Sequence, residues 1–317
     1  MRIVDLIACF QDTFSKSNND SLKQHTAQAV QSNRVYKEGF ICQHRPNVSA
    51  CFDVSFSQQI RCENPPTHNV FDRFHNKAAT QNPMPNENAT IKVISGTTFD
   101  TAKRYCTIGK VAVLNFANPV NPGGGVQRGA MAQEECLCRS SNLYTCISDP
   151  NVFDEYYGYH RNCNSDFFTD RLIYTKNVTV FKDDSSVPQM LPQNEWFDVD
   201  VITCAAPYLG NRNNTDKAAL KALFKNRIKN IFETALYNDV AVMILGAFGC
   251  GAFKNPPDLV ASAFHEVIME NTYDKFFRKI VFAIKSSTNN APWGACPNIV
   301  AFELEFFGLS PELNKER

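Results

Sequence analysis

Apolar runs of strand length fill the chain from residue 91 onward. They are rich in Val and Ile and are separated by polar or glycine-containing segments, a pattern typical of buried strands. Predicted strands cover residues 91–95, 111–117, 172–181, 197–206, 240–248 and 279–285. A further apolar stretch at residues 297–307 predicts a final strand.

Two segments between the later runs have apolar residues at spacings of three and four. In residues 216–236 these include Leu220, Phe224 and Ile228, and residues 256–270 repeat the pattern. This periodicity indicates helices with one buried face. Strands that alternate with helices predict an α/β fold, which we expect to be a three-layer α/β/α sandwich with a mixed sheet.

The first ninety residues are polar and irregular, with Ser and Asn clusters and a pair of prolines. One helix is predicted here, beginning at Ser21 and ending at Gly39. We therefore expect a mainly helical and irregular extension at residues 1–90 and an α/β domain at residues 91–317.

Composition and charge narrow the class of protein. A hydrophobic fraction of 44% rules out wholesale disorder, and 32 basic against 32 acidic residues argue against a bulk nucleic-acid binder. No segment has the ~20 uninterrupted apolar residues of a membrane helix. Because Asp5 interrupts the early apolar run, the N-terminus does not predict a secretion signal. We expect an intracellular protein, cytoplasmic, or nuclear in a eukaryote.

The 12 cysteines are scattered, and only Cys136 and Cys138 are closely spaced. Neither a CxxC motif nor paired histidines accompany them, so the pattern favours reduced structural thiols over a zinc site or a disulfide framework. No base stands at a recognisable spacing from this pair. Buried helix cysteines are therefore favoured over a nucleophile.

Seven of the 14 glycines fall in two short loops, each between a predicted strand and a helix. They are Gly123, Gly124, Gly125 and Gly129 in the first loop, and Gly246, Gly249 and Gly251 in the second. Glycines let the backbone approach a ligand, and amides beside a helix N-terminus attract anions. A tight turn explains one such loop, whereas two favour a phosphate or diphosphate site. Neither loop has the spacing of a Walker A or dinucleotide motif.

Two adjacent carboxylates, Glu134 and Glu135, follow the first loop. They would repel a diphosphate unless they faced another part of the ligand. A sugar meets that requirement, because its hydroxyls donate to carboxylates and one carboxyl group can serve as acid or base. The alternative is an ordinary charged first turn of a helix, which the helix dipole favours.

The segment NPGGGVQRGAMAQEE has seven residues between Gly125 and Gln133. It is similar to the GGG-x(6–8)-QEE signature of poly(ADP-ribose) glycohydrolases, and NFANPVNPGGGV resembles the asparagine-containing loop of macrodomains. From about residue 21 to residue 284 the chain resembles the microbial-type family of these enzymes. The resemblance implies that residues 91–317 form a macrodomain-like catalytic domain that hydrolyses ribose–ribose O-glycosidic bonds in poly(ADP-ribose) and releases ADP-ribose, with no metal and no cofactor.

The resemblance also assigns roles to single residues. Glu135 matches the acid/base, and Glu134 matches a partner that orients the ribose and helps to raise the pKa of Glu135. Protonated Glu135 would donate to the leaving hydroxyl and then activate water. The substrate-binding matches are Asn118, Gly123, Gly124, Gly125, Val126, Gln133, Gly249, Cys250, Gly251, Ala252 and Phe253. Among them, Asn118 and Phe253 are expected near the distal ribose, and the glycine loops at the diphosphate.

One position departs from the pattern. Macrodomains often carry an Asp after a Gly at the end of the first core strand, where it reads the adenine amino group, whereas this chain has Gly96-Thr97-Thr98. Which residue reads adenine is therefore open.

Two other activities remain possible alternatives: removal of single ADP-ribosyl groups from protein or nucleic acid, and binding of ADP-ribose without cleavage. The pair Glu134 and Glu135 argues against a pure binder, and the glycines of both loops argue against a protein that merely retains the fold. The expected partners are poly(ADP-ribose) or ADP-ribosylated macromolecules as substrate and ADP-ribose as product, with neither a membrane nor bulk nucleic acid.

Overall fold

The computed structural model describes residues 54–63, 67–71, 89–163, 165, 167–185, 187–210, 212, 215–285 and 296–308. Within these ranges, no helix is both long and apolar enough to cross a membrane. The helix predicted between Ser21 and Gly39 lies outside the described residues.

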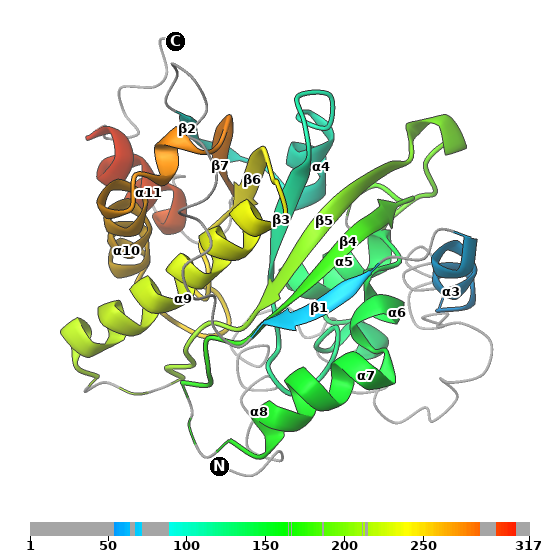
Figure 1. The fold of residues 1–317 in the computed structure, drawn as a ribbon, viewed down its shortest axis with the longest axis horizontal. Helices are drawn as coiled ribbons and strands as arrows, with labels where there is room; N and C mark the ends of the chain where they lie inside the picture. Colours follow the sequence, from blue (N-terminus) through cyan, green and yellow to red (C-terminus); the bar gives the residue numbers. More distant parts are fainter. Residues whose placement is uncertain are drawn as a thin grey trace, which may run out of the picture.

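A seven-stranded mixed sheet forms the centre of the described structure, in the order β1-β4-β5-β3-β6-β7-β2 (Figure 1). Its strands are β1 (His68–Phe71), β2 (Thr90–Ser95), β3 (Val111–Phe116), β4 (Leu172–Val180), β5 (Phe197–Cys204), β6 (Val242–Leu245) and β7 (Lys279–Ile284). The strands from β5 to β2 are parallel, whereas β4 is antiparallel to β5 and to β1. The carboxyl ends of β3, β6, β7 and β2 therefore meet at one edge of the sheet.

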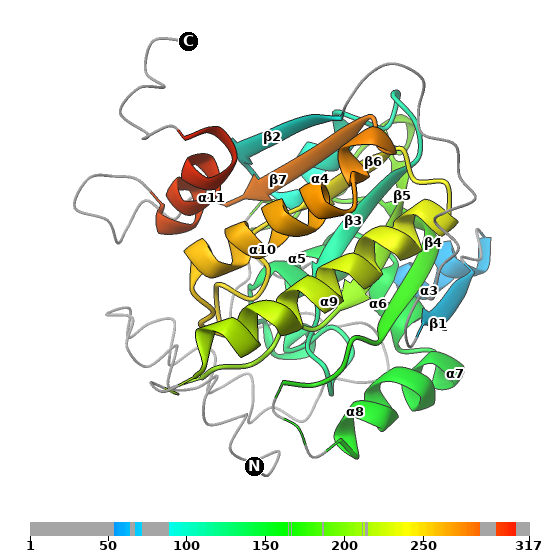
Figure 2. The same ribbon diagram turned by 60° about the vertical axis from the view of Figure 1, so that its left-hand side comes forward.

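Helices cover both faces of the sheet. They are α3 (Val54–Glu63), α4 (Thr98–Lys103), α5 (Gln133–Ser140), α6 (Leu143–Ile147), α7 (Pro150–Val152), α8 (Tyr159–Arg161), α9 (Lys217–Tyr237), α10 (Pro257–Glu270) and α11 (Pro297–Phe307). Helices α9 and α10 lie across one face (Figure 2), whereas α4, α5 and α6 lie on the other. The expected three-layer α/β/α arrangement with a mixed sheet is confirmed.

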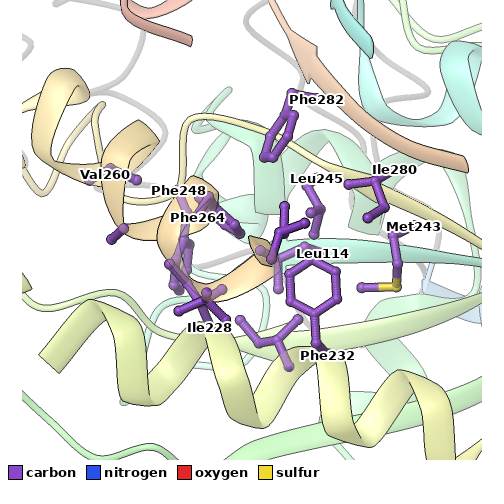
Figure 3. Close-up of a cluster of buried hydrophobic side chains, with 14 of the residues drawn as sticks. Leu114, Ile228, Phe232, Met243, Leu245, Phe248, Val260, Phe264, Ile280 and Phe282 are labelled. Carbon is purple, nitrogen blue, oxygen red and sulfur yellow. The ribbon is translucent and has the colours of Figure 1, made fainter. Parts of the chain in front are cut away.

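The two cores follow from the alternation of side chains along each strand. In β3, Leu114 faces the core beneath α9 and α10, whereas Val113 faces the one beneath α5. Figure 3 shows the first of these cores, where Ile228 and Phe232 of α9 meet side chains from β3, β6 and β7. Burial on both faces explains why the strands appear in the sequence as continuous apolar runs.

The six strands predicted from residue 91 onward are confirmed, and so are the helices predicted at residues 216–236 and 256–270. Helix α9 begins where the side chain of Asp216 accepts hydrogen bonds from the amides of Ala218 and Ala219.

The strand predicted at residues 297–307 is wrong, because this segment is helix α11. Pro297 stands in its first turn, where the missing amide costs nothing. Ile299, Phe302 and Phe306 recur at spacings of three and four and pack against the core, with Phe302 5.0 Å from Phe282 between ring centroids. A short apolar run bounded by proline does not by itself distinguish a strand from a buried helix.

Two described elements precede residue 90. Strand β1 pairs with β4, and Phe56 of α3 packs edge-on against Phe181, with 5.0 Å between ring centroids. The boundary between an N-terminal extension and the α/β domain stays a prediction, although β1 contributes to the same sheet as the later strands.

Candidate active site

The site begins where β3 ends. The chain leaves the sheet after Phe116, forms the first glycine loop and returns as α5, whose first residue is Gln133. The side chain of Gln133 accepts a hydrogen bond from the Phe116 amide at 2.9 Å and donates to the Leu114 carbonyl at 2.7 Å and to the Thr98 hydroxyl at 3.1 Å. Gln133 therefore fixes the start of α5 against the end of β3 and the start of α4.

Glu134 is buried, and both of its carboxylate oxygens accept hydrogen bonds. The Asn118 amide donates to Oε2 at 2.7 Å, and the side chain of Asn115 donates to Oε1 at 3.3 Å. Asn115 lies on β3 with no solvent exposure and also donates to the hydroxyl of Thr203 at 3.2 Å. The orientation of Glu134 is therefore set by the strand beneath it.

Glu135 is equally buried, but only one of its oxygens is engaged. The Gly125 amide donates to Oε1 at 2.8 Å, whereas Oε2 has no hydrogen-bond partner among the described residues. A buried oxygen without a partner is uncommon, and active sites are where such groups concentrate.

Burial raises the pKa of both carboxyl groups. For Glu134 the charge of Glu135 raises the pKa further, while the Asn118 amide, the Asn115 side chain and the Gly123 amide lower it. For Glu135 the Gly125 amide is the largest opposing influence, followed by the charge of Arg139. Two adjacent buried carboxyl groups resist simultaneous ionisation, so one of them retains a proton more readily than an exposed glutamate does.

The first glycine loop is shaped around these carboxylates. Gly123 and Gly124 adopt φ values of 64° and 58°, a left-handed conformation that favours glycine. A Cβ on Gly124 would overlap Oε1 of Glu135, and a Cβ on Gly123 would stand 2.8 Å from the Tyr144 ring. The amides of Gly124 and Val126 donate to carbonyls within the loop, so this loop supports the carboxylate pair.

The second glycine loop follows β6, and its glycines differ in their surroundings. Gly249 has a φ of 76°, and a Cβ there would stand 2.5 Å from Cβ of Ala206, whereas a Cβ on Gly251 would meet nothing within 4 Å. Among the described residues, the amides of Gly251, Ala252 and Phe253 donate to no acceptor. Three consecutive amides without a described acceptor beside the cavity are donors available to an anion.

A cavity of about 340 Å3 joins the two regions. Eight of the predicted site residues line it, namely Asn118, Gln133, Glu134, Glu135, Gly249, Gly251, Ala252 and Phe253. Residues 123–126 and Cys250 do not belong to its lining. The structure therefore brings most of the predicted residues together and places the first loop behind the carboxylates.

Asn118 forms the turn that leaves β3. Its side-chain oxygen accepts hydrogen bonds from the amides of Val120 and Asn121, both at 2.9 Å. Its side-chain nitrogen donates to no described acceptor, which leaves a donor beside the cavity.

Several polar residues that line or support the cavity were missed by sequence reasoning, among them Asn115 and Asp184. Asn115 is a lone amide within the apolar run of β3, and that contrast is the signal that identifies it. Asp184 lines the cavity although it stands far along the chain, so no local motif marks it. Burial raises the pKa of Asp184 to about 6, while the Thr97 hydroxyl lowers it and the charge of Asp100 raises it.

The cysteines beside the carboxylates are free thiols. Cys138 is fully buried, and burial raises its pKa well above the usual range; burial also raises the pKa of Cys136 to about 11. Neither thiol forms a ready thiolate, which agrees with the prediction of unreactive helix cysteines, although Cys136 is half-buried and only Cys138 is buried.

A family model, "Microbial-type PARG, catalytic domain", matches residues 3–183. This span is more than half of the 317 residues. The chain belongs to the microbial-type poly(ADP-ribose) glycohydrolase family. No match is found among curated protein sequences.

Solved structures of poly(ADP-ribose) glycohydrolases share the fold. The enzyme from Deinococcus radiodurans in complex with ADP-ribose is 35% identical over 70% of this chain and 85% of its own, with a TM-score of 0.61. The enzyme from Thermomonospora curvata is 24% identical over 89% of this chain and 98% of its own, with a TM-score of 0.65, and it supports the fold alone. The macrodomain-like architecture of the family accounts for the position of the cavity at the carboxyl ends of the strands.

Proposed function

We propose that the protein hydrolyses the ribose–ribose O-glycosidic bonds of poly(ADP-ribose) and releases ADP-ribose, with Glu135 as the acid and base. Family membership supports the substrate and the reaction. The observation that supports the role of Glu135 is its buried Oε2, which has no described partner and belongs to a residue that lines the cavity.

The distribution of donors supports a particular placement of the substrate. The free amides of Gly251, Ala252 and Phe253 would bind the diphosphate, next to the first loop. The free side-chain nitrogen of Asn118 would contact the distal ribose. Phe253, whose ring packs edge-on against Tyr208 at 5.4 Å, would then lie beside that ribose. The anomeric carbon would face the carboxylate pair.

The hydrogen bonds support Glu135 as the carboxyl group that holds the proton, and we weigh these contacts above the burial and the charge of Glu135 that raise the pKa of Glu134. Donors that face a carboxylate favour its charged form, and N–H groups reach both oxygens of Glu134. Glu135 receives one such bond, so its Oε2 is the natural position for the retained proton. Glu135 would therefore be the acid, and charged Glu134 would accept hydrogen bonds from ribose hydroxyls.

The proposed hydrolysis needs no reactant besides the substrate and water. Glu135 donates its proton to the glycosidic oxygen as the bond to the anomeric carbon breaks, and positive charge develops on the sugar. The carboxylate of Glu135 then takes a proton from a water molecule, and the oxygen of that water bonds to the anomeric carbon. Glu135 is protonated again, and the charge of Glu134 and the diphosphate favour the transient cation.

The first rival is removal of single ADP-ribosyl groups, which uses the same cavity and differs in the group attached to the ribose. One experiment separates the two activities. The protein is incubated with poly(ADP-ribose) and with mono-ADP-ribosylated protein and nucleic acid, and the released ADP-ribose is measured. We expect release from the polymer. Release from the mono-modified substrates alone would establish the rival, and binding without release from any of them would indicate an ADP-ribose reader.

We also propose that the protein acts inside the cell. The eight cysteines whose side chains the structure describes are free, including the buried Cys138 and Cys146, as expected in a reducing compartment.

A further inference from the structure

The cavity extends well beyond the carboxylate pair. Its lining continues from the end of β3 past the ends of β6 and β7 to Gly96–Thr98 at the end of β2. Three strand spacings separate β3 from β2, which corresponds to about 14 Å across the sheet edge. If the ribose lies at Glu135 and the diphosphate at the second loop, as proposed above, the adenine must occupy this remaining part.

Few polar groups line that remaining part. Asp184 and Lys285 carry charges there, and Asn298 of α11 contributes an amide. The residue that macrodomains would place at the end of β2 to accept from adenine is here Thr97. A carboxylate acceptor for the adenine amino group would therefore come from elsewhere in the chain.

Asp184 is the carboxylate that meets this requirement. Of the residues that line the cavity, only Glu134, Glu135 and Asp184 carry carboxyl groups, and Asp184 has 8% exposure. It reaches the cavity near the N-termini of α4 and α5, and its charge acts on Cys136 of α5 and is itself influenced by Lys285. A carboxylate has two oxygens with about four acceptor positions, so contacts with α4 leave capacity for a ligand.

We propose that Asp184 is the specificity-determining residue for the base of the substrate, and that it accepts a hydrogen bond from the adenine amino group. The inference rests on the proposed function and adds the residue that selects the base. A buried carboxylate that accepts from an N–H group of the base is left unpaired when the base presents a carbonyl oxygen at that position. Such a base is therefore bound more weakly.

An alternative role for Asp184 is purely structural. Its carboxyl group lies beside the start of α4, where the Phe99 amide and Thr97 lower its pKa and where a carboxylate can satisfy amides that have no partner within the helix. This role predicts an effect of substitution on stability and none on the choice between two bases. Base preference therefore separates the two roles.

The test measures the affinity of the full-length protein for ADP-ribose and for inosine diphosphate ribose by calorimetry. In the inosine compound a carbonyl oxygen replaces the amino group and the neighbouring ring nitrogen N1 carries a hydrogen, while the two riboses and the diphosphate are unchanged. The wild type should prefer ADP-ribose by about tenfold or more, a factor that corresponds to about 1.4 kcal/mol. In Asp184→Asn the side-chain amide can donate to the carbonyl, so the preference should vanish or reverse.

Asp183→Asn is the matched control, because this neighbouring carboxylate accepts from Ser185 and Gln189 outside the cavity. It should keep the wild-type preference. If Asp184→Asn fails to fold, Asp184→Ser replaces it, since a hydroxyl can still accept from the α4 amides. A wild-type protein that cleaves the polymer but binds both ligands equally, or a folded Asp184 variant with wild-type preference, would overturn this inference alone. A protein that binds neither ligand and cleaves no polymer would overturn the proposed function with it.

Discussion

The two glycine loops have similar compositions and lie at the ends of neighbouring strands, yet their glycines meet different physical demands. In the first loop, a Cβ on Gly124 would displace Glu135, and the Gly125 amide already binds that residue. In the second, a Cβ on Gly251 would meet no protein atom, and the amides of residues 251–253 have no described acceptor.

This difference shows that glycine density alone does not identify a ligand contact. The first loop uses its glycines to bring backbone amides against a buried carboxylate, which we propose to be catalytic. In the second loop, Gly251 leaves space beside amides that we propose to bind the diphosphate. Substitutions in the two loops should therefore impair different steps.

Among the substitutions that compare the two loops, the largest effect is expected for Gly124→Ala. The new methyl group would overlap Oε1 of Glu135 at a position where φ is 58°. Turnover of poly(ADP-ribose) should fall by about 10²-fold, because displacing a catalytic group by 1 Å costs about that much. Initial rates measured per folded molecule provide the test.

Gly129→Ala is the matched control for Gly124→Ala. Gly129 has a φ of 77°, so alanine introduces similar backbone strain, but nothing lies within 4 Å of its Cβ. It should lose stability while turnover per folded molecule stays near wild type. Equal losses of turnover in both variants would mean that strain, and not the position of Glu135, limits the reaction.

A smaller effect is expected for Asn115→Leu, which removes the side-chain donor to Glu134. A hydrogen bond to a charged group contributes about 1.5–3 kcal/mol, so turnover should fall about tenfold or more. Asn115→Asp should be more damaging, because it places a third carboxyl group against Glu134. Steady-state kinetics test this order, with Asn271→Leu as a control that removes an amide at the end of α10. Equal activity in the two Asn115 variants would contradict it.

Gly251→Ala should affect binding more than turnover. Its methyl group would enter the cavity without touching protein, so the melting temperature should stay near wild type while ADP-ribose binds about tenfold more weakly. Calorimetry and thermal denaturation of the same preparation check this combination. Unchanged affinity would remove the second loop from the diphosphate site.

The smallest expected effect is on how the free energy of unfolding depends on pH. Because burial raises the folded-state pKa of Glu135 above its ordinary value near 4.5, the folded state holds the proton more tightly than the unfolded state. The contribution of Glu135 to the free energy of unfolding is therefore fully present below about pH 4.5 and is lost as pH rises through the raised pKa.

Glu135→Gln should therefore match the wild type in melting temperature near pH 4 and exceed it at pH 8, by about 2–4 °C for each kcal/mol regained. The oxygen of the new side-chain amide can still accept from the Gly125 amide. The NH2 group then takes the position of Oε2, which has no described partner in the wild type. Glu134→Gln also removes a carboxyl group of raised pKa, but its NH2 would face the donors Asn115 and Asn118, and this conflict should outweigh the gain. Thermal scans across this pH range test the contrast, and a Glu135→Gln protein that is less stable than wild type at pH 8 would contradict it.

The sequence predicted the buried strands, the long helices and the carboxylate pair, because each depends on local periodicity or on a short motif. It predicted a strand in place of α11 because an apolar run of that length suits either element. Asp184 reaches the cavity only through tertiary packing, so no local pattern contains it.

The sequence also predicted that both loops contact the diphosphate. That remains a proposal, but the loops differ in a way that composition does not express. Whether an amide faces a ligand or a carboxylate depends on hydrogen bonds between segments, such as the one from Gly125 to Glu135.

The central claim is that Glu135 transfers the proton, and the most direct measurement compares catalysis with binding in Glu135→Gln. The substitution preserves size and the bond from Gly125, but it removes the group that donates and recovers a proton. Turnover of poly(ADP-ribose) should fall by about 10²–10⁴-fold, the usual contribution of a general acid or base, while the calorimetric affinity for ADP-ribose changes little. Wild-type turnover in Glu135→Gln would contradict the account.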